Sequence, residues 1–458
     1  MPSAVVHRLR SAIGLGLLAD GKRLPKEADL AAQLGVTAFA LREALAELRK
    51  QGLVVTRAGK YGGSFVTYPA ESERLEQAEL SELSSAELRD LGDWRQMLAA
   101  HAAALAAQRA SESNVKMLVT CAARVGEATT SLEARRAHGR FHLELASAAQ
   151  SMRITRAEFA VHEQIDWLFG LTLQTPAQRS AAARGLAEVA EAVKARDPSG
   201  ARAAAEKHVA WLIRMLAQLR LEGIAPQQDR YPGVSSNSME AEVGAVVNRL
   251  EFELAGIAAD VAPAMAGSDD LQRIRRLVTL SMLQHFEAFP PYIKGVGVVA
   301  EVGIVPEQPH WIEYWRRTDS GPVADNHHVL DPTREDFYDY QSMEFVARPR
   351  ESHKLWAHGP YVDYGGVDNY ILTIASPILA EGKFYGVISA DILIADFESW
   401  LSPLLAAAGE TYLLNSENRV IVSNSVTFGV GDEMRARDGY HRSDFPAFGW
   451  SLLAKVDD

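Results

Sequence analysis

Apolar residues near the N-terminus repeat at helical spacing in two blocks separated by a short break. The first block covers residues 26–34, and the second begins at Thr37, after Gly35, and runs to Gln51. Thr37 is a suitable N-cap for the second helix. The apolar residues of that helix share one face: Leu41, Ala44, Leu45 and Leu48. This pattern predicts a helix-turn-helix, whose second helix can enter the major groove of DNA.

Two short β-prone runs follow the helices. They cover residues 53–56 and 64–67 and are joined by a basic, glycine-rich segment at residues 57–63. A hairpin after a helix-turn-helix predicts a winged helix-turn-helix, which we expect over residues 1–70. The glycines do not indicate a nucleotide-binding loop, because they precede a strand rather than a helix.

The middle of the chain has helical periodicity with few Pro or Gly. It is rich in Ala, Leu, Glu and Arg and predicts an all-α bundle of six or seven helices over residues 80–225. A polar, turn-forming stretch at residues 226–239 predicts a linker.

The C-terminal third, residues 240–458, begins with a long amphipathic helix and continues in strands. The helix must pack on a sheet or on its twin in a dimer, and packing within its own domain is favoured. Its apolar stripe consists of Met239, Val243, Val246, Leu250, Leu254, Ile257 and Val261. A second helix and seven β-prone runs follow, which predicts an α+β domain with an antiparallel sheet.

Charge is distributed unevenly along this multidomain chain. The whole chain carries −12, whereas residues 1–69 hold ten basic and five acidic side chains, which gives +5 there and −17 over the remainder. A basic surplus confined to the winged helix favours double-stranded DNA as a partner.

Cysteine usage and hydropathy indicate the compartment. The single Cys121 excludes an internal disulfide and a cysteine-based zinc site. The N-terminus has no signal-peptide pattern, and no stretch approaches the roughly 20 apolar residues that a membrane span needs. We therefore expect a reduced, cytoplasmic protein without a membrane partner.

Residues 24–66 have the sequence LPKEADLAAQLGVTAFALREALAELRKQGLVVTRAGKYGGSFV. This stretch resembles the N-terminal domain of the GntR family of bacterial regulators. The resemblance implies DNA contacts from the recognition helix, the turn and the wing. With nearby basic residues added, the candidates are Thr37, Arg42, Arg49, Lys60, Gly62 and Gly63. Ala28 and Ala38 stand where the family usually has Arg, so we expect weaker contacts or an unusual operator. The alternative is a winged helix used for protein contacts.

The helical middle resembles the FCD ligand-binding domain of the FadR subfamily of GntR regulators. The resemblance lies in DWRQMLAAHAAALAAQRA, ARRAHGRFHLELASAAQ and GLAEVAEAVKARDPSGARAAAEKHVAWLIRML. That domain commonly holds a divalent metal through one Asp and three His. Here His142 and His208 match two histidines, His138 stands at the Asp position, and Leu186 replaces the remaining histidine.

His138, His142 and His208 are therefore candidates for a degenerate site for Zn or Ni, ions that imidazole suits. His138 and His142 lie at i and i+4 on one helix face. Since one ligand is lost and a charged oxygen becomes a neutral nitrogen, we expect weak metal binding or none. The alternative is that the histidines are ordinary buried or solvated side chains.

The C-terminal third resembles Cache (PAS-like) sensor domains. The resemblance lies in GPYVDYGGVDNYILTIASPILAEGKFYGVISADILIADFESWL and YLLNSENRVIVSNS, and implies a small-molecule site lined by aromatic and acidic residues. The candidates are Trp311, Tyr314, Arg316, Tyr338, Tyr340, Tyr361, Asp363 and Asp391. This chemistry suits a cation or zwitterion, so the candidate effectors are an amine, an amino acid or an organic acid. About half of the aromatic residues are expected to belong to the core instead.

Together these features predict a ligand-responsive transcriptional regulator. It would bind a palindromic operator as a homodimer and sense a small metabolite mainly through residues 240–458. One alternative is a sensor or interaction protein with weakened DNA binding, which Ala28 and Ala38 favour. The other is an enzyme fused to a DNA-binding domain, but residues 240–458 contain no nucleophile-elbow, zinc-protease or dinucleotide motif. We therefore expect no enzymatic activity.

Overall fold

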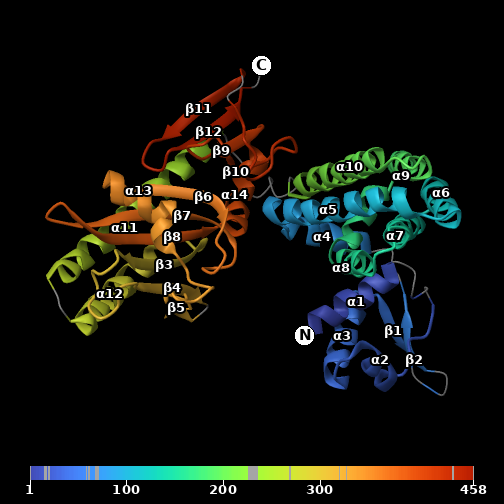
Figure 1. Cartoon of the computed structure of the whole chain (residues 1–458), viewed down its shortest axis with the longest axis horizontal. Helices are drawn as coiled ribbons and strands as arrows, with labels where there is room; N and C mark the ends of the chain where they lie inside the picture. The colour runs from blue at the N-terminus through green and yellow to red at the C-terminus, as the bar shows by residue number, and fades with distance from the viewer. Residues whose placement is uncertain are drawn as a thin grey trace. The chain divides into compact units, whose positions relative to one another are not determined.

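The computed structural model describes residues 2–14, 18, 21–57, 59, 62–67, 72–224, 236–267, 270–318, 320–325, 327–435 and 438–456. The chain forms two compact units, Met1–Leu83 with Glu87–Gly223 and Ser84–Ala86 with Ile224–Asp458 (Figure 1). The first unit contains the winged helix and the helical bundle, and the second contains the α+β domain. The predicted multidomain fold is confirmed.

The winged helix consists of three helices and a hairpin. Its elements are α1 (Pro2–Gly14), α2 (Glu27–Leu34), α3 (Ala38–Lys50), β1 (Val54–Arg57) and β2 (Gly63–Val66). Gly35 ends α2 at φ 69°, a left-handed conformation that glycine adopts without strain. The Thr37 side chain caps α3 by accepting a hydrogen bond from the Ala40 N–H. The predicted apolar face of α3 is buried, so its opposite face remains exposed.

The helical bundle follows in the same unit. Its described helices are α4 (Ser72–Glu82), α5 (Ser85–Arg109), α6 (Glu112–Glu127), α7 (Ser131–Ala148), α8 (Met152–Phe169), a 3-10 helix (Gly170–Leu173), α9 (Pro176–Lys194) and α10 (Pro198–Ile224). Ser111, Thr130 and Thr175 each form a capping box, which fixes where α6, α7 and α9 begin. Small side chains, mostly Ala, fill the core between these helices.

The second unit contains two antiparallel sheets and helices that pack against them. Its helices are α11 (Ser236–Gly267), α12 (Leu271–His285), α13 (Glu344–Ser352) and α14 (Ile394–Ala407). Its strands are β3 (Ile293–Ala300), β4 (Ile312–Thr318), β5 (Gly321–Ala324), β6 (Trp356–Val362), β7 (Tyr370–Ala380), β8 (Lys383–Leu393), β9 (Thr411–Leu414), β10 (Val420–Ser423), β11 (Tyr440–Phe445) and β12 (Trp450–Lys455). The larger sheet has the order β5-β4-β3-β8-β7-β6 and the smaller one β10-β9-β12-β11.

The predicted stripe of α11 is buried along its whole length. It packs against β7 and β8 in the main core of the unit (Figure 1), which confirms packing within its own domain. α13 contributes Phe345 and Val346 to a second apolar cluster, on the opposite face of the sheet. The large sheet is therefore covered on both faces.

Some predictions differ from the structure at the edges of elements. Residues 226–235 of the predicted linker lie outside the described residues, and the remaining four open α11. The sequence pattern does not predict β5, β6 and β11, which are edge strands with largely half-buried or exposed side chains. Among the described residues, no helix combines the length and apolar character needed to cross a membrane.

Candidate functional site

The central strands of the large sheet carry polar side chains on the face that α13 covers. β8 places Ser389 and Asp391 on this face, and Thr373 of β7 pairs directly with Asp391. Because side chains alternate along a strand, Ala390 and Ile392 belong to the apolar core on the other face. These polar residues therefore lie on strands whose opposite face is apolar.

A glycine of β3 allows Tyr314 to reach these residues. β3 lies between β4 and β8, and its Gly295 pairs with Asp391. A Cβ at Gly295 would overlap the Tyr314 hydroxyl. The Tyr314 side chain therefore extends over Gly295, and its hydroxyl donates a hydrogen bond to Asp391 Oδ2 at 2.9 Å.

Hydroxyl groups surround the two carboxylates of this site. Asp391 Oδ1 also accepts a hydrogen bond from Thr373 Oγ1 at 2.8 Å, and Thr373 Oγ1 lies 3.0 Å from the Tyr361 hydroxyl. The Tyr338 hydroxyl donates to Asp363 Oδ1 at 2.9 Å. The carboxylates are thus held by neutral donors.

Burial controls the protonation of these groups. It raises the pKa of Asp391 to about 7, and the charge of Asp363 adds to this rise, while hydrogen bonds from Thr373 and Tyr314 oppose it. Burial, followed by the charges of both carboxylates, holds the pKa of Tyr361 well above its ordinary value. The tyrosine hydroxyl therefore remains protonated, whereas Asp391 can change its charge near neutral pH.

These polar residues line part of a small cavity. The centre of a water-sized molecule can occupy about 20 Å³ of it, so a larger ligand must displace part of the lining. The lining comprises Val299, Ile312, Tyr314, His328, Tyr338, Phe345, Tyr361, Asp363, Val367, Thr373, Ser389 and Asp391.

Five of the eight predicted ligand residues line this cavity: Tyr314, Tyr338, Tyr361, Asp363 and Asp391. The other three lie elsewhere. Trp311 is buried in the main core, and its backbone N–H donates to the hydroxyl of buried Tyr340 at 3.0 Å. Arg316 Nε donates to Asp325 Oδ2 at 2.7 Å and lies outside the lining.

Sequence reasoning missed three polar lining residues, His328, Thr373 and Ser389. Thr373 and Ser389 are polar residues within apolar strand runs, a signal that could have identified them. His328 lies between elements and has no such pattern. Burial lowers its pKa to about 4, and His327 adds to this effect, so the His328 ring is neutral near pH 7.

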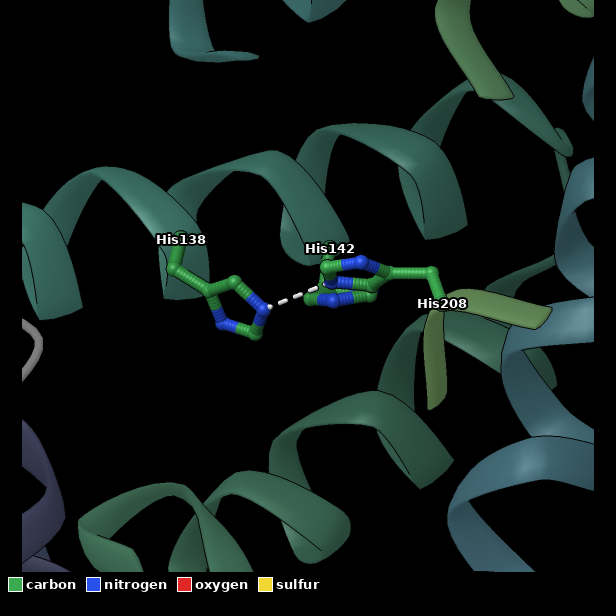
Figure 2. Close-up of side chains that lie close together, drawn as sticks. All are labelled: His138, His142 and His208. Carbon is green, nitrogen blue, oxygen red and sulfur yellow. Dashed lines mark hydrogen bonds between the residues drawn. The ribbon is translucent and has the colours of Figure 1, made fainter. Parts of the chain in front are cut away.

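Three buried histidines converge in the helical bundle. His138 and His142 project from α7 and His208 from α10 (Figure 2). Candidate ligand nitrogens of the three rings all lie within 4.8 Å of one another, and the Nε2 atoms of His138 and His208 are 3.1 Å apart. Neither ring nitrogen of buried His142 has a hydrogen-bond partner among the described residues. Such a cluster fits a metal ion with nitrogen ligands.

The surroundings keep the imidazoles of His142 and His208 neutral. Burial lowers the pKa of His142 and His208 well below its ordinary value, and the charge of nearby Arg95 lowers both further. Buried Arg95 donates through Nη1 to both oxygens of Glu158, at 2.8 and 2.9 Å. Neutral imidazole is the form that binds metal.

α9 contacts the histidine cluster without adding a nitrogen to it. A Cβ at Gly185 would lie 2.5 Å from His208 Nδ1, so the backbone of α9 packs directly on that ring. The neighbouring Leu186, at the position of the family's remaining histidine, is fully buried in the alanine-rich core. The described cluster therefore has three nitrogen ligands rather than a mixed set of four.

The recognition helix presents two predicted DNA-binding arginines. Both Arg42 and Arg49 are exposed. Arg42 Nε donates to the Ala38 carbonyl at 3.2 Å, and Arg49 Nη1 donates to Thr56 Oγ1 of the wing at 3.2 Å. Both guanidiniums thus keep donors available on the exposed face.

Of the other predicted contacts, Thr37 caps α3, and the remaining three belong to the segment at residues 60–63. The Gly62 N–H donates to the Gly59 carbonyl at 2.8 Å. Gly63 opens β2, and a Cβ there would lie 2.6 Å from Arg23 Nε. Lys60 lies outside the described residues.

Family models match three stretches of the chain. They are "Bacterial regulatory proteins, gntR family" at residues 2–66, "FCD domain" at 90–210, and "Methyl-accepting chemotaxis protein-like, first PDC sensor domain" at 304–399. The chain combines a GntR-type DNA-binding domain, an FCD domain and a PDC sensor domain.

Named relatives match part of the chain. "Putative HTH-type transcriptional regulator RmpR" of Mycobacterium gastri is 42% identical over 35% of this chain and 59% of its own length. "Putative L-lactate dehydrogenase operon regulatory protein" of Escherichia coli K12 is 34% identical over 32% of this chain and 58% of its own length. The chain thus spans less than two thirds of either relative. The solved structure "Methyl-accepting Chemotaxis protein X" is 16% identical over 53% of this chain and 99% of its own, with a TM-score of 0.37.

The sites described above fall within the matched domains. The three histidines lie in the FCD domain, and Thr37 and Arg42 lie in the GntR-type domain. All of the cavity lining except Val299 lies within the stretch that matches the PDC sensor domain. The matched domains and named relatives are those of regulators and sensors rather than enzymes.

Proposed function

We propose that this protein is a transcriptional regulator that binds a palindromic operator as a dimer and responds to a small metabolite. The supporting observation is that one chain joins an exposed recognition-helix face to a cavity lined by carboxylates and hydroxyls in a sensor domain. The PDC sensor domain is the main sensor in this proposal, because Asp363 and Asp391 line its cavity. The lining contains no arginine, so these carboxylates can pair with a cationic ligand.

We further propose that the effector is a small amine. Asp391 and Asp363 can hold an ammonium group through charge-assisted hydrogen bonds, and the tyrosine rings can add cation–π contacts. Arg316 pairs with Asp325 outside the cavity, so it does not offer the lining a partner for a carboxylate. This arrangement favours an amine over an amino acid or an organic acid.

Salt-sensitive binding to duplex DNA is expected of the full chain, and Arg42→Ala should weaken it. If Arg42 contacts a base, the loss should be about 1–3 kcal/mol, and if it contacts only phosphate, the salt slope should fall by about one. Fluorescence anisotropy with fragments upstream of the protein's own gene, at two salt concentrations, measures both effects.

The matched control for this test is Arg435→Ala, which removes an exposed arginine of the second unit. It should bind DNA like the wild type. If no upstream fragment shows salt-sensitive binding, the regulator proposal is wrong, and a sensor or interaction protein becomes the better interpretation.

We also propose that the FCD domain can hold a Zn or Ni ion through His138, His142 and His208. The ion would crosslink α7 and α10 and offer a further position to an anion. Three neutral ligands leave the charge of the ion uncompensated near Arg95, so its affinity should be lower than in a site containing a carboxylate.

A further inference from the structure

The recognition helix begins with an unusual apolar surface. Phe39 lies in the first turn of α3 and is 67% exposed. The helix buries its opposite face through Leu41, Ala44, Leu45 and Leu48. Phe39 therefore contributes little to the core of the winged helix.

The other residues of this turn carry no charged side chains. Ala38 is exposed and carries only a methyl group. The Thr37 side chain accepts the capping hydrogen bond from the Ala40 N–H at 3.2 Å. Arg42, one turn further on, provides the first guanidinium of the helix. The leading end of the recognition helix is thus mainly an apolar surface centred on Phe39.

In a helix-turn-helix, the N-terminal residues of the recognition helix contact base edges in the major groove. The apolar group exposed there is the C5-methyl of thymine, which phenylalanine can contact. We propose that Phe39 recognises a thymine methyl group in each half-site of the operator. This inference rests on the proposed DNA-binding function and specifies how the recognition helix selects its sequence.

The position of Arg42 places this thymine relative to a second base. Arg42 lies three positions after Phe39, which corresponds to about 4.5 Å along a helix axis. One base-pair step is about 3.4 Å. If Arg42 binds guanine, the usual partner of arginine in the major groove, thymine and guanine should lie one or two base pairs apart in each half-site.

Substitution of Phe39 is a clean test because of its exposure. Phe39→Ala removes no core contact and introduces a better helix former, so the melting temperature should not fall. The matched control is Phe252→Ala, which truncates a phenylalanine of similar exposure, 73%, on α11 of the second unit. Any difference in DNA binding between the variants then comes from the location of the ring.

The experiment compares thymine with deoxyuridine, which lacks only the C5-methyl group. A preferred duplex is first selected from a random pool with the wild-type full chain. Each thymine is then replaced by deoxyuridine, and affinity is measured by fluorescence anisotropy. The wild type and Phe252→Ala should lose about fourfold in affinity at one thymine per half-site, the effect of burying one methyl group. Phe39→Ala should bind the thymine duplex and the deoxyuridine duplex with equal affinity. The salt dependence of its binding should match that of the wild type.

The outcomes separate this inference from the proposed function. The thymine contact is wrong if the wild type binds DNA in a salt-sensitive way but is indifferent to every deoxyuridine. It is also wrong if Phe39→Ala still discriminates between thymine and deoxyuridine. If the wild type selects no duplex and shows no salt-sensitive binding, the proposed DNA-binding function itself fails, and the Phe39 assignment fails with it.

Discussion

Asp391→Asn is expected to abolish the thermal stabilisation that a small amine gives to the full chain. The amide keeps the shape of the carboxylate: its oxygen can accept a hydrogen bond from one of Tyr314 and Thr373, and its NH2 can donate to the hydroxyl oxygen of the other. It has no charge to hold an ammonium group. At about 100 times its dissociation constant, a ligand stabilises the wild type by about 2.7 kcal/mol. Differential scanning fluorimetry with a panel of amines, amino acids and organic acids measures the shift.

The control is Asp325→Asn, which removes a carboxylate that pairs with Arg316 outside the cavity lining. This variant should respond to the amine like the wild type. The assignment of Asp391 is wrong if Asp391→Asn responds to the same degree as the wild type, or if only organic acids without a cationic group stabilise the protein.

The same response should depend on pH. Since burial raises the pKa of Asp391 to about 7, the group is largely protonated below pH 7 and ionised above it. Only the ionised form attracts an ammonium group, so amine affinity should fall by about tenfold between pH 8 and pH 6, with a proton released on binding. The raised pKa also means that ionising Asp391 destabilises the unliganded fold, a cost that grows from about pH 4 to pH 7 and that Asp391→Asn should remove.

His142→Ala is expected to lower the affinity of the FCD domain for Zn or Ni by more than about 100-fold. It removes one of three ligand nitrogens, a larger change than the loss of an outer-shell partner, which typically costs about 10–100-fold. Isothermal titration calorimetry of the chelator-washed full chain with each ion gives the affinity, and elemental analysis gives the bound amount.

The matched control for metal binding is His101→Ala, which removes an exposed histidine of the same helical domain. It should bind the ion like the wild type. The three-histidine site is wrong if His142→Ala retains wild-type affinity. Tight, stoichiometric binding by the wild type would instead show that replacing the family's Asp and His weakens the site less than we expect.

The fold could be predicted from sequence where an element buries one face in a core, because its apolar residues then repeat at a regular spacing. The buried face of α3 and the stripe of α11 each face one continuous apolar core, so the repeat is clear. The strands β5, β6 and β11 form edges, where side chains meet both solvent and neighbouring elements and alternation is lost. Such strands depend on tertiary pairing rather than local pattern.

The sites were less accessible to sequence reasoning because they depend on geometry across elements. Trp311 and Tyr340 have suitable chemistry but are buried in apolar clusters and are not part of the cavity lining, whereas Thr373 enters it through its register with Asp391. Local pattern does not show that Gly295 makes room for Tyr314. Likewise, only the pairing of α7 with α10 brings His208 beside His138.

The most direct test of the proposed regulator is whether an amine that stabilises the protein also changes its affinity for DNA. The measurement is fluorescence anisotropy of the selected duplex with the wild-type full chain and with Asp391→Asn, each with and without the amine. A functional coupling of about 1–3 kcal/mol predicts a change of about 5- to 150-fold for the wild type and none for Asp391→Asn. An amine that binds through Asp391 but leaves the affinity for the duplex unchanged would contradict the proposal.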